Sequence, residues 1–193
     1  MNAKKTINIA VFLSGTGSNT EQIIRSLKKE ENVNVSLLLS NKPENGAKRI
    51  SDENGIKLIS FNKTILENEQ TLINELQSNK IDFIVLAGFL LKIPSYLVEA
   101  YPNKIINIHP ALLPKYGGKG MYGKHVHKAV YEKNEKETGI TIHYVNENYD
   151  EGNIIAQFKV DLNENDTPET IEQKVRALEK EHFAPTIEKL LSE

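Results

Sequence analysis

Residues 7–29 read Ile-Asn-Ile-Ala-Val-Phe-Leu-Ser-Gly-Thr-Gly-Ser-Asn-Thr-Glu-Gln-Ile-Ile-Arg-Ser-Leu-Lys-Lys. The first seven are mostly apolar and rich in Ile and Val, which is typical of a central strand buried on both faces. Ile23, Ile24 and Leu27 then recur at helical spacing, which predicts a helix over residues 20–29. A glycine loop therefore joins a strand to a helix, as in the sheets of α/β proteins.

Outward from this stretch, strand and helix patterns continue to alternate. Further strands are expected at residues 33–39, 56–59, 82–87 and 105–109. Further helices are expected at residues 47–54, 67–79 and 95–100. This alternation predicts a doubly wound parallel sheet with right-handed crossovers.

The alternation changes after residue 114. A glycine-rich loop at residues 117–123 precedes an expected helix at residues 124–132. Two strands are expected next, at residues 138–145 and 154–160. The connection between them is too short for a crossover helix, which predicts that they are antiparallel neighbours.

One more helix is expected near the C-terminus. Thr167 can cap it and Pro168 suits its first position, whereas Pro185 is expected to kink or split it. The predicted fold class is α/β: a doubly wound, mostly parallel twisted sheet with helices on both faces and an antiparallel C-terminal strand pair. We expect a single domain over residues 1–193.

Composition excludes several classes of function. Lys plus Arg is 24 and Asp plus Glu is 26, without a basic block that would indicate nucleic-acid binding. The absence of cysteine excludes a disulfide framework, a thiolate metal site and a Cys nucleophile. The longest apolar run, residues 83–91, is far shorter than the roughly 20 residues that span a bilayer. We expect a cytoplasmic protein without nucleic-acid or membrane partners, either a monomer or a homodimer.

The glycine loop at residues 14–19 indicates an anion site. A helix N-terminus presents free N–H groups and about half a positive charge, which suits a phosphate, and Ser18 and Asn19 could add donors. The dinucleotide fingerprint fails because Thr20 stands where its third glycine belongs, and the ATPase phosphate-loop motif is missing. The loop therefore favours a phosphorylated small molecule over NAD or ATP; the alternative is a tight turn without a ligand.

Residues 107–114 read Asn-Ile-His-Pro-Ala-Leu-Leu-Pro and place two polar side chains at a strand end. Asn107 and His109 lie two residues apart, so they share one face of the strand, which Pro110 should end. In open α/β sheets this end of a strand is where ligands bind. The pair offers a hydrogen-bond donor and a group that titrates near neutral pH. Alternatively, both side chains only form hydrogen bonds with backbone groups at the strand end.

Four motifs occur in the same order as in a known family. They are Ser14-Gly15-Thr16-Gly17-Ser18-Asn19, Leu86-Ala87-Gly88-Phe89, residues 107–114, and Asp150-Glu151-Gly152. With these motifs the chain resembles the phosphoribosylglycinamide formyltransferases, which are folate-dependent enzymes of purine biosynthesis. The resemblance runs from Ile7 to the last helix. It differs at Lys63, where the family often has an Arg near the folate tail, and at residues 117–123, a loop that looks longer here.

The resemblance implies a reaction between two small molecules without a metal: 10-formyltetrahydrofolate as co-substrate and glycinamide ribonucleotide as acceptor. It also implies site residues. These are Asn107, His109 and Asp150 for catalysis; Gly17, Ser18 and Asn19 for the substrate phosphate; Leu90, Leu91, Lys92, Ile93 and Asn107 for the folate; Glu181 for the glycinamide; and His143 near the site.

The expected chemistry follows from these residue types. The glycinamide amine attacks the formyl carbon, and Asn107 and protonated His109 donate hydrogen bonds to the negative oxygen that develops. Asp150 is expected to raise the pKa of His109, which then passes a proton to the leaving folate nitrogen.

Three alternatives remain. The first is another folate-dependent formyltransferase or a formyltetrahydrofolate deformylase, although those enzymes usually carry an additional domain. The second is a non-catalytic phosphosugar-binding module. The third is a metal hydrolase that uses His125, His127, His109 and Asp150 as ligands, although histidines at i and i+2 of a helix point to different faces.

Overall fold

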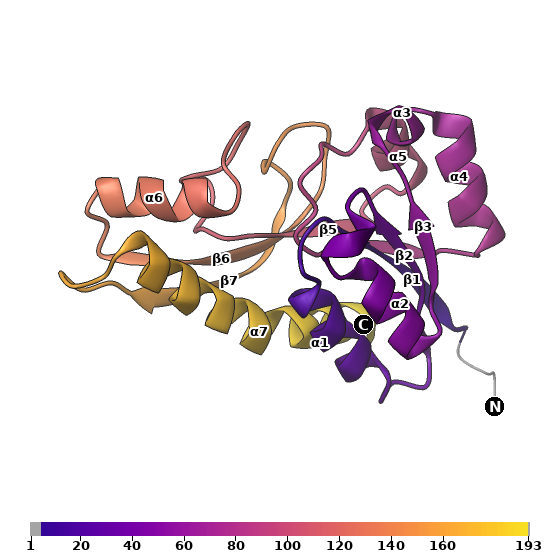
Figure 1. Cartoon of the computed structure of the whole chain (residues 1–193), viewed down its shortest axis with the longest axis horizontal. Coiled ribbons are helices and arrows are strands. Elements are labelled where there is room, and N and C mark those ends of the chain that lie inside the picture. The colour runs from indigo at the N-terminus through magenta and orange to yellow at the C-terminus, as the bar shows by residue number, and fades with distance from the viewer. Residues whose placement is uncertain (1–4, 193) are drawn as a thin grey trace.

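The computed structural model describes residues 5–192, which form a seven-stranded sheet with the strand order β3-β2-β1-β4-β5-β6-β7 (Figure 1). The strands are β1 (Ile7–Leu13), β2 (Val33–Ser40), β3 (Lys57–Ser60), β4 (Phe83–Leu86), β5 (Ile105–His109), β6 (Glu137–Tyr144) and β7 (Ile154–Asp161). The first five strands pair in parallel, whereas β6 and β7 join as antiparallel strands. The predicted fold class is confirmed.

Helices cover both faces of the sheet. They are α1 (Ser18–Leu27), α2 (Ala47–Asn54), α3 (Lys63–Leu66), α4 (Glu69–Ser78), α5 (Ser95–Ala100), α6 (Lys124–Glu132) and α7 (Pro168–Ser192), with a short 3₁₀ helix, η1 (Pro43–Asn45). The long α7 runs beneath β6 and β7 and ends beside α1 (Figure 1).

Successive side chains of β1 point to opposite faces of the sheet, and each face has its own hydrophobic core. Ile9, Val11 and Leu13 point into a core formed with α1, α2, α6 and α7. Ala10 and Phe12 point to the opposite side, into a core formed with α3, α4 and α5. All five side chains are fully buried, because a central parallel strand has helices on both faces.

Two helices differ from the sequence predictions. The helix expected at residues 67–79 is α4, and the short helix α3 before it was not expected. Asn62 caps α3 and Asn68 caps α4, each by accepting a backbone N–H bond from the third residue after it. Pro185 does not split α7. Buried Phe183 and Ile187 on either side of the proline hold the helix against the sheet, and tertiary packing of this kind outweighs one lost backbone bond.

The parallel strands bring three loops to one edge of the sheet. Residues 14–17 follow β1, residues 87–94 follow β4 and residues 110–123 follow β5. The β6–β7 loop, residues 145–153, is joined to β5 by the Val145 N–H bond to the Ile105 carbonyl. None of the helices within residues 5–192 is long and apolar enough to cross a membrane.

Gly139 provides a test of the β6–β7 pairing. A Cβ at this position would overlap the Phe158 backbone carbonyl and lie 2.8 Å from Leu112 Cδ2. We expect Gly139→Ala to lower the free energy of unfolding by about 1–3 kcal/mol, measured from the urea midpoint at unchanged m-value. Gly15→Ala is the matched control, since a Cβ there meets nothing within 4 Å. Equal stability of the two variants would contradict the close approach of the strands.

Candidate active site

A cleft of about 400 Å³ lies at the edge of the sheet where the three loops meet. Its walls come from the β1–α1 loop, the loops after β4 and β5, the β6–β7 loop, the start of α6 and the middle of α7. Parallel α/β sheets bind ligands at the carboxyl ends of their strands, and this cleft has that position.

One end of the cleft is the N-terminus of α1. Gly17 has a φ of +84° and no side chain caps the helix, so the first backbone N–H groups stay available to a ligand. A side chain at Gly17 would collide with Ile50 of α2, so the close packing of the loop also requires glycine. Ser18 and Asn19 lie in the cleft wall beside it.

Three side chains of α7 extend this end of the cleft. Glu172, Arg176 and Glu179 follow the i, i+4, i+7 spacing of one helix face and all line the cleft. Arg176 pairs with Glu172 at 2.7 Å, and the Asn19 amide donates to Glu179 Oε2 at 2.9 Å. Burial raises the pKa of Glu179, and the hydrogen bond from Asn19, which favours the charged carboxylate, offsets only part of this rise.

Asn107 is oriented by the strand beside it. His143 lies opposite Asn107 in the β5–β6 register, and its Nδ1–H donates to the Tyr144 carbonyl at 2.8 Å. His143 Nε2 is therefore an acceptor and receives one amide N–H of Asn107 at 3.1 Å. The second amide N–H of Asn107 has no partner among residues 5–192, and Asn107 lines the cleft.

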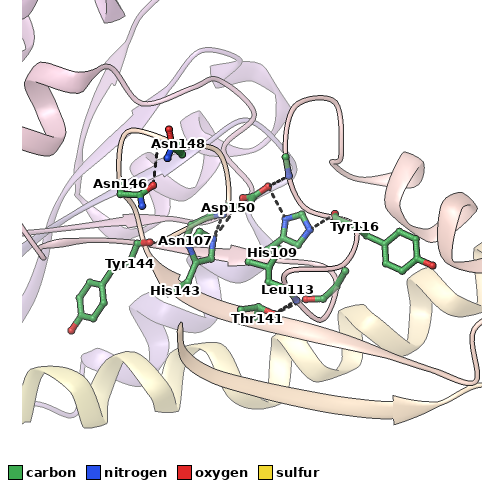
Figure 2. A network of polar contacts seen from close by, with 12 residues as sticks. Asn107, His109, Leu113, Tyr116, Thr141, His143, Tyr144, Asn146, Asn148 and Asp150 are labelled. Atoms are coloured by element: carbon green, nitrogen blue, oxygen red, sulfur yellow. Dashed lines mark hydrogen bonds and ion pairs between the residues drawn. The ribbon is translucent and has the colours of Figure 1, made fainter. Parts of the chain in front are cut away.

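The His109 ring is held in one tautomer. Its Nε2 lies 2.8 Å from the Tyr116 carbonyl and must donate to it, which leaves Nδ1 facing Asp150 Oδ2 at 3.5 Å (Figure 2). Burial lowers the pKa of His109 below its ordinary value of 6.5, although Asp150 and the Tyr116 carbonyl raise it. Asp150 thus raises the pKa of His109 as the sequence led us to expect, but desolvation has the larger effect, so the protonated His109 of the sequence expectation is not the resting form.

Asp150 lies between the two imidazoles (Figure 2). Its Oδ1 is 3.7 Å from His143 Nε2, and its Oδ2 accepts the Gly118 N–H at 2.9 Å. Burial also lowers the pKa of His143. One carboxylate therefore faces two neutral rings, and a proton gained by His109 Nδ1 would be stabilised by it.

Buried Thr141 fixes the chain after His109. Its hydroxyl donates to the Ala111 carbonyl at 2.7 Å and accepts the Leu113 N–H at 2.9 Å. The turn after β5 is thereby attached to β6, and His109 lies opposite Thr141 in the register.

The other end of the cleft is apolar. Leu90, Leu91, Lys92 and Ile93 all line it. Ser14 fixes their loop, because its hydroxyl accepts the Leu90 N–H at 3.1 Å. Facing them is Tyr149 of the β6–β7 loop, with Lys92 Nζ 5.3 Å from the centre of its ring.

The structure thus gathers most of the predicted site residues in one cleft. Gly17, Ser18, Asn19, residues 90–93, Asn107, His109, His143 and Asp150 all line it. Glu181 does not: its side chain is 71% exposed and lies nearest His182. Glu179, which sequence reasoning missed, occupies the cleft instead, and its helical spacing from Glu172 was the available signal.

The four proposed metal ligands are not brought together. His125 is exposed and lies edge-on to Tyr122, whereas His127 is buried in the cleft wall. Within residues 5–192 no group of three or more His, Asp or Glu side chains is arranged to hold a metal ion.

Comparison with known proteins points to one family. Residues 7–187 match the family described as "Formyl transferase". The chain is 39% identical to phosphoribosylglycinamide formyltransferase of Bacillus subtilis, covering 94% of this chain and 93% of that protein. It is 44% identical to the chloroplastic enzyme of Arabidopsis thaliana over 90% of this chain, but spans only 61% of that protein.

Solved structures agree with the sequences. The crystal structure of phosphoribosylglycinamide formyltransferase from Bacillus halodurans superposes with a TM-score of 0.87 at 36% identity, covering 96% of each chain. This chain therefore has the same fold as that protein over nearly the whole length of both. The chain belongs to the formyl transferase family, among the phosphoribosylglycinamide formyltransferases.

Proposed function

We propose that this chain transfers the formyl group of 10-formyltetrahydrofolate to the amine of 5-phosphoribosylglycinamide, giving the N-formyl ribonucleotide and tetrahydrofolate. One observation carries the proposal: a single cleft joins an uncapped helix N-terminus, an apolar wall and the Asn107–His109–Asp150 group. Family membership supports the same reaction.

The two ends of the cleft suit the two substrates. The α1 N-terminus with Gly17, Ser18 and Asn19 would bind the phosphate of the ribonucleotide. Glu179, hydrogen-bonded to Asn19, would accept from the ribose hydroxyls or the amine. The apolar wall at residues 90–93 would bind the flat pterin of the folate, so that the formyl carbon meets the amine beside β5.

Asn107 would stabilise the charge that develops. Attack of the amine on the formyl carbon puts negative charge on the formyl oxygen. The amide N–H of Asn107 that His143 does not use can donate to that oxygen. Because His143 is neutral and fixed by Tyr144, the donor is oriented before the substrates arrive, and removing such a donor typically costs about 10²–10³ in rate.

His109 would act first as a base and then as an acid. Its Nδ1 is unprotonated at rest and can take the proton that the attacking amine loses, while Asp150 stabilises the imidazolium as it forms. The same proton then goes to the folate nitrogen as the C–N bond breaks. Proton transfer of this kind contributes about 10²–10⁴ in rate.

The reaction itself is the first test. We expect loss of the formyl group of 10-formyltetrahydrofolate, followed by absorbance, only when glycinamide ribonucleotide is present. Loss with water alone would show a deformylase. Binding of the ribonucleotide by calorimetry without any turnover would indicate a phosphosugar-binding module, and either result would contradict the proposal.

The His109–Asp150 pair gives a prediction about pH. In NMR spectra of the free protein, His109 should titrate at a pH below 6.5. The His109 signal is the one that disappears in the His109→Asn variant. Asp150→Asn removes a charge that raises this pKa, so the midpoint should move still lower and kcat should fall by about 10²–10⁴. An unchanged midpoint, or one shifted upward, would exclude the assigned role of Asp150.

Glu179 and Glu181 form a matched pair of variants. Glu179→Gln should raise the KM for the ribonucleotide by about tenfold or more, since hydrogen bonds to charged groups contribute about 1.5–3 kcal/mol, and leave the KM for the folate unchanged. Glu181→Gln changes an exposed carboxyl outside the cleft and should behave as the wild type. The reverse pattern would restore the original assignment of Glu181.

A further inference from the structure

The turn at residues 116–118 contacts two of the groups that take part in the proposed reaction. The Tyr116 carbonyl accepts the His109 Nε2–H at 2.8 Å, and the Gly118 N–H donates to Asp150 Oδ2 at 2.9 Å. His109 ends β5, whereas Asp150 lies in the β6–β7 loop, so the turn connects side chains from two separate segments. The position of the imidazole relative to the carboxylate therefore depends on the conformation of this turn.

The backbone of the turn is unusual. Tyr116 has a φ of +57° and Gly118 a φ of +96°, both in the left-handed region. For a residue as large as tyrosine this conformation is unfavourable, and it persists only where the surrounding structure holds it. Space is also tight, since a Cβ at Gly117 would lie 2.6 Å from Leu113 Cδ2 and 3.2 Å from Asp150 Cβ. Contacts outside the turn must therefore hold Tyr116 in place.

The Tyr116 side chain is anchored outside the cleft. Its ring points away from His109 and packs against the core formed with α1, α2, α6 and α7 (Figure 2). Its hydroxyl donates to Glu135 Oε1 at 2.9 Å, and Lys115 Nζ donates to both oxygens of the same carboxylate at 3.0 and 3.2 Å. Glu135 lies between α6 and β6, and neither Glu135 nor Tyr116 lines the cleft. The anchor is thus separate from the surface that a substrate would reach.

The charges at the anchor favour the hydrogen bond from Tyr116. Burial and the Glu135 carboxylate raise the pKa of Tyr116 to about 12, so the hydroxyl keeps its proton at neutral pH. The hydrogen bonds from Lys115 and Tyr116 lower the pKa of Glu135, which stays charged. A hydrogen bond to a carboxylate is roughly twice as strong as one between neutral groups. The Lys115 side chain is exposed, so its ion pair contributes little by comparison.

The Tyr116 carbonyl determines which nitrogen of His109 carries the proton. Nδ1 faces the Asp150 carboxylate at 3.5 Å, and a carboxylate alone would favour a proton on that nitrogen. The carbonyl of Tyr116 favours a proton on Nε2 instead. Only this second tautomer leaves Nδ1 free to take the proton of the attacking amine. A shift of the turn would therefore change the tautomer of His109.

We propose that Glu135 is a positioning residue for the formyl transfer. Through the Tyr116 hydroxyl it holds the turn at residues 116–118, and the turn keeps His109 in the Nε2–H tautomer. Glu135 itself lies outside the cleft and acts only through these intermediate contacts. The inference rests on the proposed function, because it takes His109 as the group that accepts and returns the proton.

The first test separates kcat from KM. Glu135→Ala and Tyr116→Phe should each lower kcat about tenfold, a part of the roughly 10²–10⁴ that proton transfer contributes, and leave the KM of both substrates unchanged. Glu135→Gln should keep most of the activity, since its amide oxygen can still accept the Tyr116 hydroxyl. Lys115→Met and Glu137→Ala each break a Lys–Glu pair near the anchor, the second one with Lys159, and both should match the wild type.

The second test observes the tautomer and needs no turnover. The histidine rings are labelled with nitrogen-15, and the ring shifts of His109 are recorded above its titration midpoint, the signal being the one that His109→Asn lacks. The wild type and Glu137→Ala should show the Nε2–H form. Glu135→Ala and Tyr116→Phe should gain the Nδ1–H form. The titratable groups that face His109 are unchanged in these variants; they are Asp150, His127 and His143.

The inference and the proposed function fail separately. If the wild type transfers no formyl group, the proposed function is wrong, and the tautomer in the variants still tests the anchor. If Glu135→Ala and Tyr116→Phe keep the Nε2–H form, or lose it without a loss of kcat, Glu135 does not position His109 for the reaction. Equal losses of kcat in Glu135→Ala and Glu137→Ala, or a change in KM alone, would also overturn the inference.

Discussion

The register between β5 and β6 is the constraint on which the site depends. It places His143 opposite Asn107 and Thr141 opposite His109, so each polar residue of β5 has its supporting partner across the ladder. Because side chains alternate along a strand, a slip of one residue would turn both partners to the other face. Beyond this paired segment, β6 runs directly into the short loop that carries Asp150.

Burial then decides which proton states the site can use. His109 and His143 are almost fully enclosed, and each has one ring nitrogen occupied by a backbone carbonyl, so both are neutral and each has a defined tautomer. The two rings nevertheless differ in role. The second nitrogen of His143 is taken by the Asn107 amide, while that of His109 faces only the Asp150 carboxylate. The carboxylate therefore favours proton uptake at His109 in particular.

Local sequence patterns predicted most helices and strands, because the spacing of apolar residues and the helix caps depend only on residues a few positions apart. Helix α2 spans the predicted residues 47–54 and ends before Gly55, whose φ of +64° suits glycine. What sequence could not supply depends on distant parts of the chain. Glu179 meets Asn19 across 160 positions, and choosing it over Glu181 requires knowing which face of α7 lies against α1. The direction of the His109 pKa depends in the same way on how completely the fold encloses the ring.

The two ends of the cleft are built from different kinds of structure. Regular elements form the end that we propose binds the phosphate, where a helix N-terminus and a face of α7 leave little freedom of position. Loops form the apolar end, and loops tolerate substitution more readily than helices or strands. Between the two ends lies β5, held by β4 on one side and by β6 on the other. Asn107 and His109 are thus positioned by the sheet, so a change in the loops of the apolar end can alter ligand binding there without moving either residue.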